Sequence, residues 1–262
     1  MITSTSNERV RYVRSLYRTE VRREERAFAI EGVRLVEEAL DAGMVPKLVL
    51  ADTDLLEKSA RGRQLLGRLR QHQWLAVSEK VLRYVSDTIT PQGIVAVLPV
   101  PEVERPEDLG PLVLVLDGLR DPGNVGTIIR SAEASGVIVA AFTPDCVDVH
   151  NPKVLRAGMG AHFRLKILAD MGWPEIDALL GGRPVWVAAA AQGLPHFEVD
   201  WTVDSSLIVG GEAFGASDES RRRATGFVHI PMLGRAESLN AAVAASVILF
   251  EALRQRLADK LN

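Results

Sequence analysis

In the second half of the chain, short apolar runs alternate with stretches of helical periodicity. The apolar runs predict buried strands at 112–116, 137–142, 163–167, 185–190, 206–209 and 227–230. Helical patterns separate most of them, at 125–135, 152–159 and 174–180. Near-continuous apolar strands that alternate with helices are typical of a parallel sheet covered on both faces. We therefore predict an α/β domain built on such a sheet.

A proline-rich segment separates this domain from the first part of the chain. The stretch from Pro99 to Pro111 holds four prolines and five charged residues, with little periodic apolar signal. This composition indicates a linker. We place a first domain at 1–98, the linker at 99–110 and a second domain at 111–262. Strand-like runs at 27–30, 47–51, 74–77 and 93–97 predict that the first domain is a small α/β unit.

Composition excludes several classes of protein. Hydrophobic residues make up 47% of the chain and charged residues 25%, which indicates packed cores rather than disorder. The single cysteine, Cys146, allows neither an internal disulfide nor a cysteine-based metal site, and the histidines have no metal-ligand spacing. No apolar run approaches the roughly 20 residues that a membrane helix needs. We expect a cytoplasmic protein without a metal ion or a membrane segment.

The net charge of −3 argues against a nucleic-acid partner, but the distribution of charge favours one. The first 98 residues hold 16 lysines and arginines against 13 aspartates and glutamates. Seven of the arginines crowd between positions 9 and 26. Such a run is often a solvated helix face, yet guanidinium groups also pair with phosphate and stack on bases. We take Arg9, Arg22 and Arg23 as candidate RNA contacts.

Three motifs in the second domain place polar residues or glycines where a strand ends or a helix begins. They are NVGTIIR at 124–130, LIVGGEAFG at 207–215 and IPMLGRAESLN at 230–240. In an open α/β sheet, ligands bind at that edge. The motifs therefore predict a binding site.

The first motif opens a helix. Asn124 is well placed to cap it, and Arg130 shares with Gly126 a different face from the apolar stripe. A helix N-terminus beside an amide, a glycine and an arginine can accept a phosphate and a ribose. We expect Arg130 to act as an electrostatic clamp, which stabilises negative charge that develops on a bound substrate.

The other two motifs combine glycines, a carboxylate and a helix start. Gly210 and Gly211 allow the backbone to approach a ligand closely or to adopt positive φ, and Glu212 follows them. After Ile230 the loop backbone can meet an adenine edge. Ser238 is expected to cap a helix over 239–257, with Asn240 in its first turn. The apolar side of that helix consists of Leu239, Val243, Val247, Phe250 and Leu257.

Together and in this order, the motifs resemble those of the SpoU (TrmH-like) RNA ribose methyltransferases of the SPOUT superfamily. The first domain, with FAIEG at 28–32 and TPQGI at 90–94, resembles the substrate-binding domain found ahead of that catalytic domain, a ribosomal-protein-like fold that binds kinked RNA. The resemblance implies S-adenosylmethionine as cofactor and a ribose 2′-hydroxyl, most often of 23S-type ribosomal RNA, as methyl acceptor. It also implies a C-terminal trefoil knot.

The resemblance assigns roles to individual positions. Gly210, Ile230 and Leu239 fall on positions that contact S-adenosylmethionine, and with them we predict Ala190, Gly211 and Met232 to line the cofactor site. Catalytic or RNA-contacting positions correspond to Asn124, Arg130, Glu212, Ser238 and Asn240. The family is usually described with the arginine of the first motif as the base, so both a base and a clamp remain open for Arg130.

The last helix predicts a homodimer. Arg254 and Arg256 fall where arginines of some relatives contact substrate, and Arg254 follows Asn240 by 14 residues. The two side chains point in similar directions but lie about 21 Å apart, at 1.5 Å per residue. A two-fold partner could supply Arg254 to a shared active site. Alternatively, both arginines only complement the negative end of the helix.

Two other functions stay open. One is the same chemistry on transfer RNA. The other is an RNA-binding scaffold that has lost methyl transfer, against which the presence of Asn124, Arg130, Glu212 and Asn240 speaks.

Overall fold

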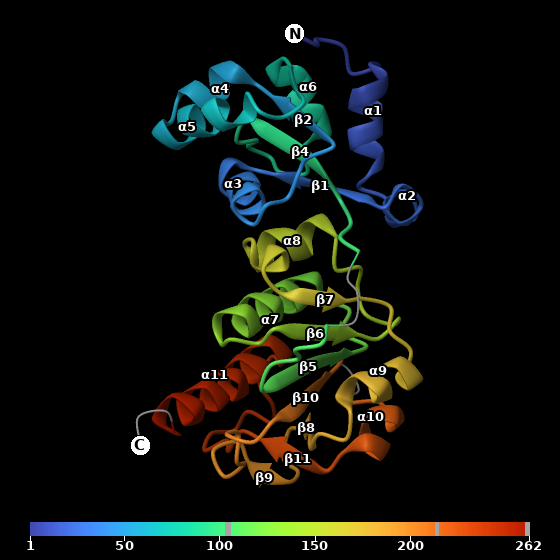
Figure 1. Cartoon of the computed structure of the whole chain (residues 1–262), viewed down its shortest axis with the longest axis vertical. Coiled ribbons are helices and arrows are strands. Elements are labelled where there is room, and N and C mark those ends of the chain that lie inside the picture. The colour runs from blue at the N-terminus through green and yellow to red at the C-terminus, as the bar shows by residue number, and fades with distance from the viewer. Residues whose placement is uncertain (103–105, 213–214, 260–262) are drawn as a thin grey trace. The chain divides into compact units, whose positions relative to one another are not determined.

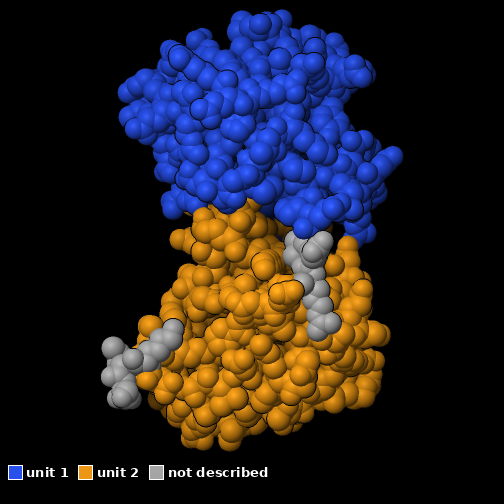
Figure 2. Space-filling view, in the orientation of Figure 1, with its two compact units in different colours: residues 1–102, 150–156 blue, residues 103–149, 157–262 orange. Residues whose placement is uncertain are grey.

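The computed structural model describes residues 1–102, 106–212 and 215–259. The chain divides into two compact units, 1–102 with 150–156 and 103–149 with 157–262 (Figure 2). The short segment 150–156 thus belongs to the first unit, although it lies within the predicted second domain. The residues at 103–105 in the predicted linker, and Ala213 and Phe214 in the second motif, lie outside the described residues.

The first unit is built on a sheet of four strands. They are β1 (Ala27–Glu31), β2 (Leu48–Ala51), β3 (Trp74–Ala76) and β4 (Ile94–Pro99), in the order β1-β4-β2-β3. The β4 strand pairs antiparallel with β1 and β2, and β3 pairs parallel with β2. All four coincide with predicted strands, because each is an apolar run bounded by polar or glycine residues.

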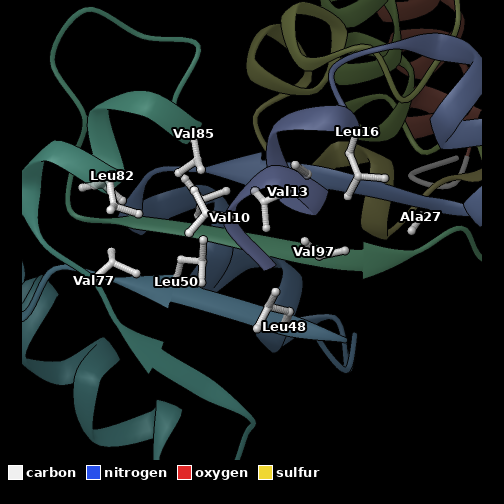
Figure 3. Packing of buried hydrophobic residues seen from close by; sticks show 13 residues of the cluster. Val10, Val13, Leu16, Ala27, Leu48, Leu50, Val77, Leu82, Val85 and Val97 are labelled. Carbon is white, nitrogen blue, oxygen red and sulfur yellow. The ribbon is translucent and has the colours of Figure 1, made fainter. Parts of the chain in front are cut away.

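Helices cover both faces of this sheet. They are α1 (Glu8–Ser15), α2 (Thr19–Glu25), α3 (Val33–Asp41), α4 (Thr53–Glu57), α5 (Ala60–Leu69) and α6 (Glu79–Val85). Val10 and Val13 of α1 pack with Leu82 of α6 against Leu50 and Val97 of the strands (Figure 3). Alternate strand residues such as Phe28 and Ile30 are also buried and point to the opposite face, where α3 contacts β1 and β4.

The second unit contains a sheet of seven strands. They are β5 (Leu112–Asp117), β6 (Val139–Phe142), β7 (Lys166–Leu168), β8 (Val185–Ala188), β9 (Leu194–Pro195), β10 (Ser205–Gly210) and β11 (Gly226–His229). Their order is β7-β6-β5-β10-β8-β11-β9, and every pair is parallel. The predicted parallel α/β fold is therefore confirmed. The strand predicted at 163–167 begins only at Lys166, because Ala161–Phe163 form a 3₁₀ turn.

Two groups of helices flank this sheet (Figure 1). The helices are α7 (Pro122–Ala134), α9 (Trp173–Leu180), α10 (Asp218–Arg223) and α11 (Ala241–Asp259). Most of α8 (Pro152–Gly158) belongs to the first unit. Ile176 and Leu179 of α9 pack on Val113, Val187 and Ile208 of the strands. On the other face, α7 and α11 lie side by side, and the hydroxyls of Ser131 and Ser246 meet at 2.7 Å.

The side of α11 that packs in the core is not the apolar side expected from the sequence. The buried residues are Ala242, Ala245, Ile248, Leu249 and Ala252. Val243, Val247, Phe250 and Leu257 are instead 48%, 37%, 47% and 52% exposed. We call these four residues the α11 stripe. Alanines on the inner side permit close packing against α7, which leaves the larger side chains on the surface. None of the helices described is long and apolar enough to cross a membrane.

Candidate cofactor pocket and active site

A cavity lies at the carboxyl ends of the central strands of the second unit. Because all strands of this sheet run parallel, the segments that follow β8, β10 and β11 meet at one edge. The cavity has a volume of about 800 Å³. Its wall consists of residues 188–192, 209–212, 215–216, Arg221, Ile230, 238–241, Ala244 and Ile248. Small-molecule sites typically enclose about 300–1,000 Å³, so the cavity can hold a nucleoside-sized ligand.

Most of the predicted cofactor residues lie on this wall. They are Ala190, Gly210, Gly211, Ile230 and Leu239, whereas Met232 is not among the lining residues. Of the predicted catalytic residues, Glu212, Ser238 and Asn240 also line the cavity. Three segments separated by up to fifty residues therefore converge at a single site.

The two consecutive glycines lie where other backbone segments pass closely. A Cβ atom on Gly210 would lie 2.2 Å from the backbone nitrogen of Ala216, and one on Gly211 would lie 2.7 Å from the carbonyl oxygen of Gly118. Neither glycine has positive φ. Both positions thus allow backbone segments of the protein to approach closely. These backbone contacts help to define the position of the cavity wall.

A hydrogen-bonded chain connects the three motifs. Asn124 Nδ2 donates to Glu212 Oε1 at 2.8 Å, and Asn240 Nδ2 donates to Asn124 Oδ1 at 2.9 Å. Asn240 Oδ1 accepts from the backbone N–H groups of Ala242 and Val243 at 2.9 and 3.2 Å. A carboxylate can only accept and a backbone N–H can only donate, so the two ends of the chain fix both amide orientations. Each amide keeps one N–H that this chain does not use.

Glu212 is held in its ionised form. Burial raises the pKa of its carboxyl, but hydrogen bonds from the Asn124 side chain and from backbone N–H groups outweigh burial, so the pKa lies below its usual value. One of these donors is the backbone of Arg120, at 3.5 Å. A depressed pKa means that the interaction is present at neutral pH and is lost only as the pH falls through the lowered value.

Both helix caps differ from the expectation. Asp121, not Asn124, caps α7: its side chain accepts from the Asn124 N–H at 2.7 Å. Asn240, not Ser238, caps α11, which begins at Ala241. The Asp121 cap could have been predicted from the sequence, since proline is favoured at the first helical position and Pro122 directly follows an aspartate. Asn240 as a cap also explains a residue that is a poor helix former.

Sequence reasoning missed Asp117, which ends β5. Its carboxylate is buried, at 7% exposure. One oxygen accepts from the Ser217 N–H at 2.8 Å and from the Ser220 hydroxyl at 2.6 Å. It thereby fastens the start of α10 to the edge of the sheet and holds the segment around Ala216 against Gly210. An acidic residue at the end of an otherwise continuous apolar strand was the available signal.

The arginines predicted to contact RNA have different surroundings. Arg130 is exposed, does not line the cavity, and makes no hydrogen bond or ion pair within the described residues. Arg254 is also exposed and pairs with Glu251 at 2.7 Å, whereas the Arg256 side chain donates to the Pro111 carbonyl at 3.2 Å. Arg22 is buried, with its guanidinium bonded to the Leu16 carbonyl and the Thr19 hydroxyl. In the same domain, Arg9 and Arg23 are exposed.

The part of the chain that the structure describes contains no metal-binding cluster of side chains. No group of three or more histidine, cysteine, aspartate or glutamate side chains is placed to hold a metal ion there. The site instead combines backbone groups, two oriented amides and an ionised carboxylate at the rim of a cavity. Such a set can bind and orient a polar ligand and a second substrate beside it.

Comparison with known families matches both parts of the chain. Residues 111–250 match the model of the SpoU rRNA Methylase family, and residues 7–96 match the MRM3-like substrate binding domain. The first match covers all three motifs.

Individual relatives match over most of the chain. The 23S rRNA (guanosine(2553)-2'-O)-methyltransferase RlmP of Bacillus subtilis is 32% identical over 95% of this chain and 97% of its own length. The human mitochondrial rRNA methyltransferase 3 is 33% identical over 86% of this chain, which spans 67% of that relative. A crystal structure of the SpoU methyltransferase AviRb from Streptomyces viridochromogenes in complex with AdoMet matches with a TM-score of 0.86 at 31% identity, covering 96% of this chain and 99% of that one.

Proposed function

The chain belongs to the SpoU rRNA Methylase family, and on that premise we propose that it transfers a methyl group from S-adenosylmethionine to a ribose 2′-hydroxyl of ribosomal RNA. The observation that carries the proposal is the hydrogen-bonded chain of Glu212, Asn124 and Asn240 at the rim of the cavity. It unites the three motifs at the edge of the sheet where ligands bind. The Bacillus subtilis relative is named for the same reaction on 23S rRNA.

The cavity fits the cofactor. S-adenosylmethionine supplies the methyl group when bound. The wall offers backbone groups after β8, β10 and β11 for the adenine and ribose, and small side chains such as Ala189 and Ala244 leave room for both. Asn240 and Glu212 border the same cavity, so the amide chain lies beside the bound ligand. The remaining predicted contact, Met232, would need to reach the cavity from outside its present wall.

The protein's own residues would act by positioning and by charge. The free N–H groups of Asn124 and Asn240 can donate to oxygens of the substrate ribose or phosphate, and ionised Glu212 keeps the Asn124 amide turned for this purpose. We assign to Arg130 the clamp on the developing alkoxide or on a neighbouring phosphate. A role as the base is the alternative for the same residue. Aligned reactants account for much of the rate of such displacements.

The reaction is tested with radiolabelled S-adenosylmethionine, the full chain and total ribosomal RNA. We expect label in ribosomal RNA, in a dinucleotide that resists alkaline hydrolysis because its 2′-hydroxyl is blocked. Transfer RNA is the parallel substrate. Label that appears only in transfer RNA, or only on bases, would contradict the proposal, and RNA binding without any transfer would indicate the non-catalytic scaffold.

We further propose that the first unit binds the RNA substrate. Its match to a substrate-binding domain and the exposed positions of Arg9 and Arg23 support this role. Arg22 contributes to the unit's interior instead, through its bonds to Leu16 and Thr19. A trefoil knot in the C-terminal part of the sheet stays a prediction.

A homodimer is part of the proposal. The α11 stripe of Val243, Val247, Phe250 and Leu257 supports it, since water-exposed apolar side chains in a row along one helix favour a self-complementary contact. The stripe begins beside Ala244 and Leu239, which line the cavity. A partner packed there would stand close to the site, and the partner's Arg254 could serve the shared ribose.

Replacing Val247 by aspartate should convert the dimer into monomers, because an isolated carboxylate would be desolvated in an apolar contact. Sedimentation velocity measures the change. Val45→Asp, the same substitution at an exposed site of the first unit, is the control and should leave the protein dimeric. A parent protein that is monomeric, or a Val247→Asp protein that stays dimeric, would refute this arrangement.

A further inference from the structure

Three consecutive arginines on α10, at positions 221–223, differ sharply in their surroundings. Arg222 is paired with Glu219. Arg223 pairs with Asp177 and Glu219, and its guanidinium lies 4.6 Å from the centre of the Trp173 ring. Within the described residues, Arg221 has no carboxylate partner. The second and third arginines are thus explained by the fold, whereas the first is not.

Arg221 is fixed at the cavity wall. Its Nε donates to the Ala216 carbonyl at 3.2 Å, and its guanidinium lies 6.0 Å from the centre of the Phe227 ring. The side chain lines the cavity beside Gly215. The Nε bond holds the group in place, while both terminal nitrogens make no hydrogen bond or ion pair in the described part of the chain. A planar fork of two free donors is suited to a carboxylate.

The charges around the cavity narrow the choice of ligand group. Among the described residues that line the cavity, Glu212 and Arg221 are the only ionisable ones; the others are alanine, glycine, aliphatic, serine, asparagine and glutamine. Glu212 already accepts from Asn124 and from backbone. Arg221 is therefore the fixed positive charge of the wall. S-adenosylmethionine contains a single anionic group, its α-carboxylate, beside a cationic sulfonium and a cationic ammonium.

We propose that Arg221 binds the α-carboxylate of S-adenosylmethionine through its two terminal nitrogens. The proposal rests on the assignment of the cavity to this cofactor. It places the amino-acid end of the ligand at α10 and gives the cavity an electrostatic means of orienting a ligand whose other contacts are largely with neutral groups. Arg221 would thus determine specificity for the amino-acid end of the ligand.

The test is a comparison of two ligands on three proteins by calorimetric titration. The ligands are S-adenosylmethionine and its decarboxylated analogue, which lacks only the carboxylate. The proteins are the parent, Arg221→Met, which keeps an apolar stem over Phe227, and Arg222→Met as the matched control. A charge-assisted bond of this kind is worth about tenfold to a hundredfold in affinity. We expect Arg221→Met to weaken the binding of S-adenosylmethionine by that factor and to leave the binding of the analogue unchanged. Arg222→Met should bind both ligands as the parent does.

Other outcomes separate the competing explanations. An equal loss for both ligands would overturn the proposal, because it would mean that Arg221 supports the loop through Ala216 rather than the carboxylate. Unchanged binding of S-adenosylmethionine with weakened RNA binding would overturn it in favour of a phosphate contact, while the cavity assignment stands. A parent protein that binds neither ligand would contradict the cavity assignment itself, and the proposal with it.

Discussion

Replacing Arg130 by alanine is expected to lower kcat for RNA methylation by at least about a hundredfold, the range seen when one stabilising donor of a developing charge is removed. The Kd for S-adenosylmethionine should stay within about twofold, since Arg130 does not line the cavity. Single-turnover methylation and calorimetry measure the two quantities. Arg130 is exposed and unpaired in the described structure, so its removal leaves no buried partner unsatisfied and should not unfold the domain.

Two further variants test whether the effect is specific to the Arg130 guanidinium or would follow from loss of any nearby positive charge. Arg120→Ala removes an exposed arginine from the loop just before α7 and should have a much smaller effect on kcat. Arg130→Lys keeps the charge but loses the planar fork, so activity between that of the parent and that of Arg130→Ala would show that the fork contributes beyond the charge. If Arg120→Ala and Arg130→Ala lower kcat equally, the catalytic assignment of Arg130 is wrong.

Replacing Gly210 by valine should strongly weaken cofactor binding by displacing the cavity wall. The new Cβ would lie 2.2 Å from the Ala216 nitrogen and 2.3 Å from the Gly215 carbonyl carbon, which are backbone atoms and cannot turn aside as a side chain would. Overpacking of this kind costs about 1–3 kcal/mol, which corresponds to a loss of up to roughly 150-fold in affinity if the whole cost falls on the binding loop. Calorimetry well below the melting temperature measures the Kd.

Gly234→Val is the matched control for this loss. A Cβ at Gly234 meets nothing within 4 Å, although the residue lies in the segment between β11 and α11. It should bind S-adenosylmethionine as the parent does. Parent-like affinity in Gly210→Val would show that the segment around Ala216 does not form the binding wall.

The sheet architecture was predictable because the periodicity of its strands is strong. The apolar runs at 112–116 and 206–209 became β5 and β10 nearly to the residue, since both are buried on both faces. The two-residue β9 strand and the late start of β7 were not predictable, because pairings that short leave no pattern. The exposed side of α11 was misjudged for another reason: alanine and valine both count as apolar, and only packing against α7 decides which side is buried.

The site was predictable in its membership but not in its geometry. Glycine and polar residues at strand ends indicated Gly210, Glu212 and Asn240, because ligands bind at that edge of a parallel sheet. Which atoms contact which across the site could not be predicted: the bonds of Asn124 to Glu212 and Asn240, and the bond of Asp117 to Ser217, depend on how loops far apart in sequence meet. Nor could the sequence separate Arg221 from its two neighbours, since only the fold supplies the carboxylates.

The amide of Asn240 is shared between folding and chemistry. Its oxygen secures the first turn of α11, and its nitrogen orients Asn124. The two tasks therefore cannot change independently. A substitution at position 240 that stabilises the helix start would also alter the orientation of the Asn124 amide, and one that alters this orientation would destabilise the first turn of α11. This coupling ties the longest helix of the second unit to the reacting edge of the sheet, and it makes position 240 one where tolerance to mutation should be low even for a protein with stability to spare.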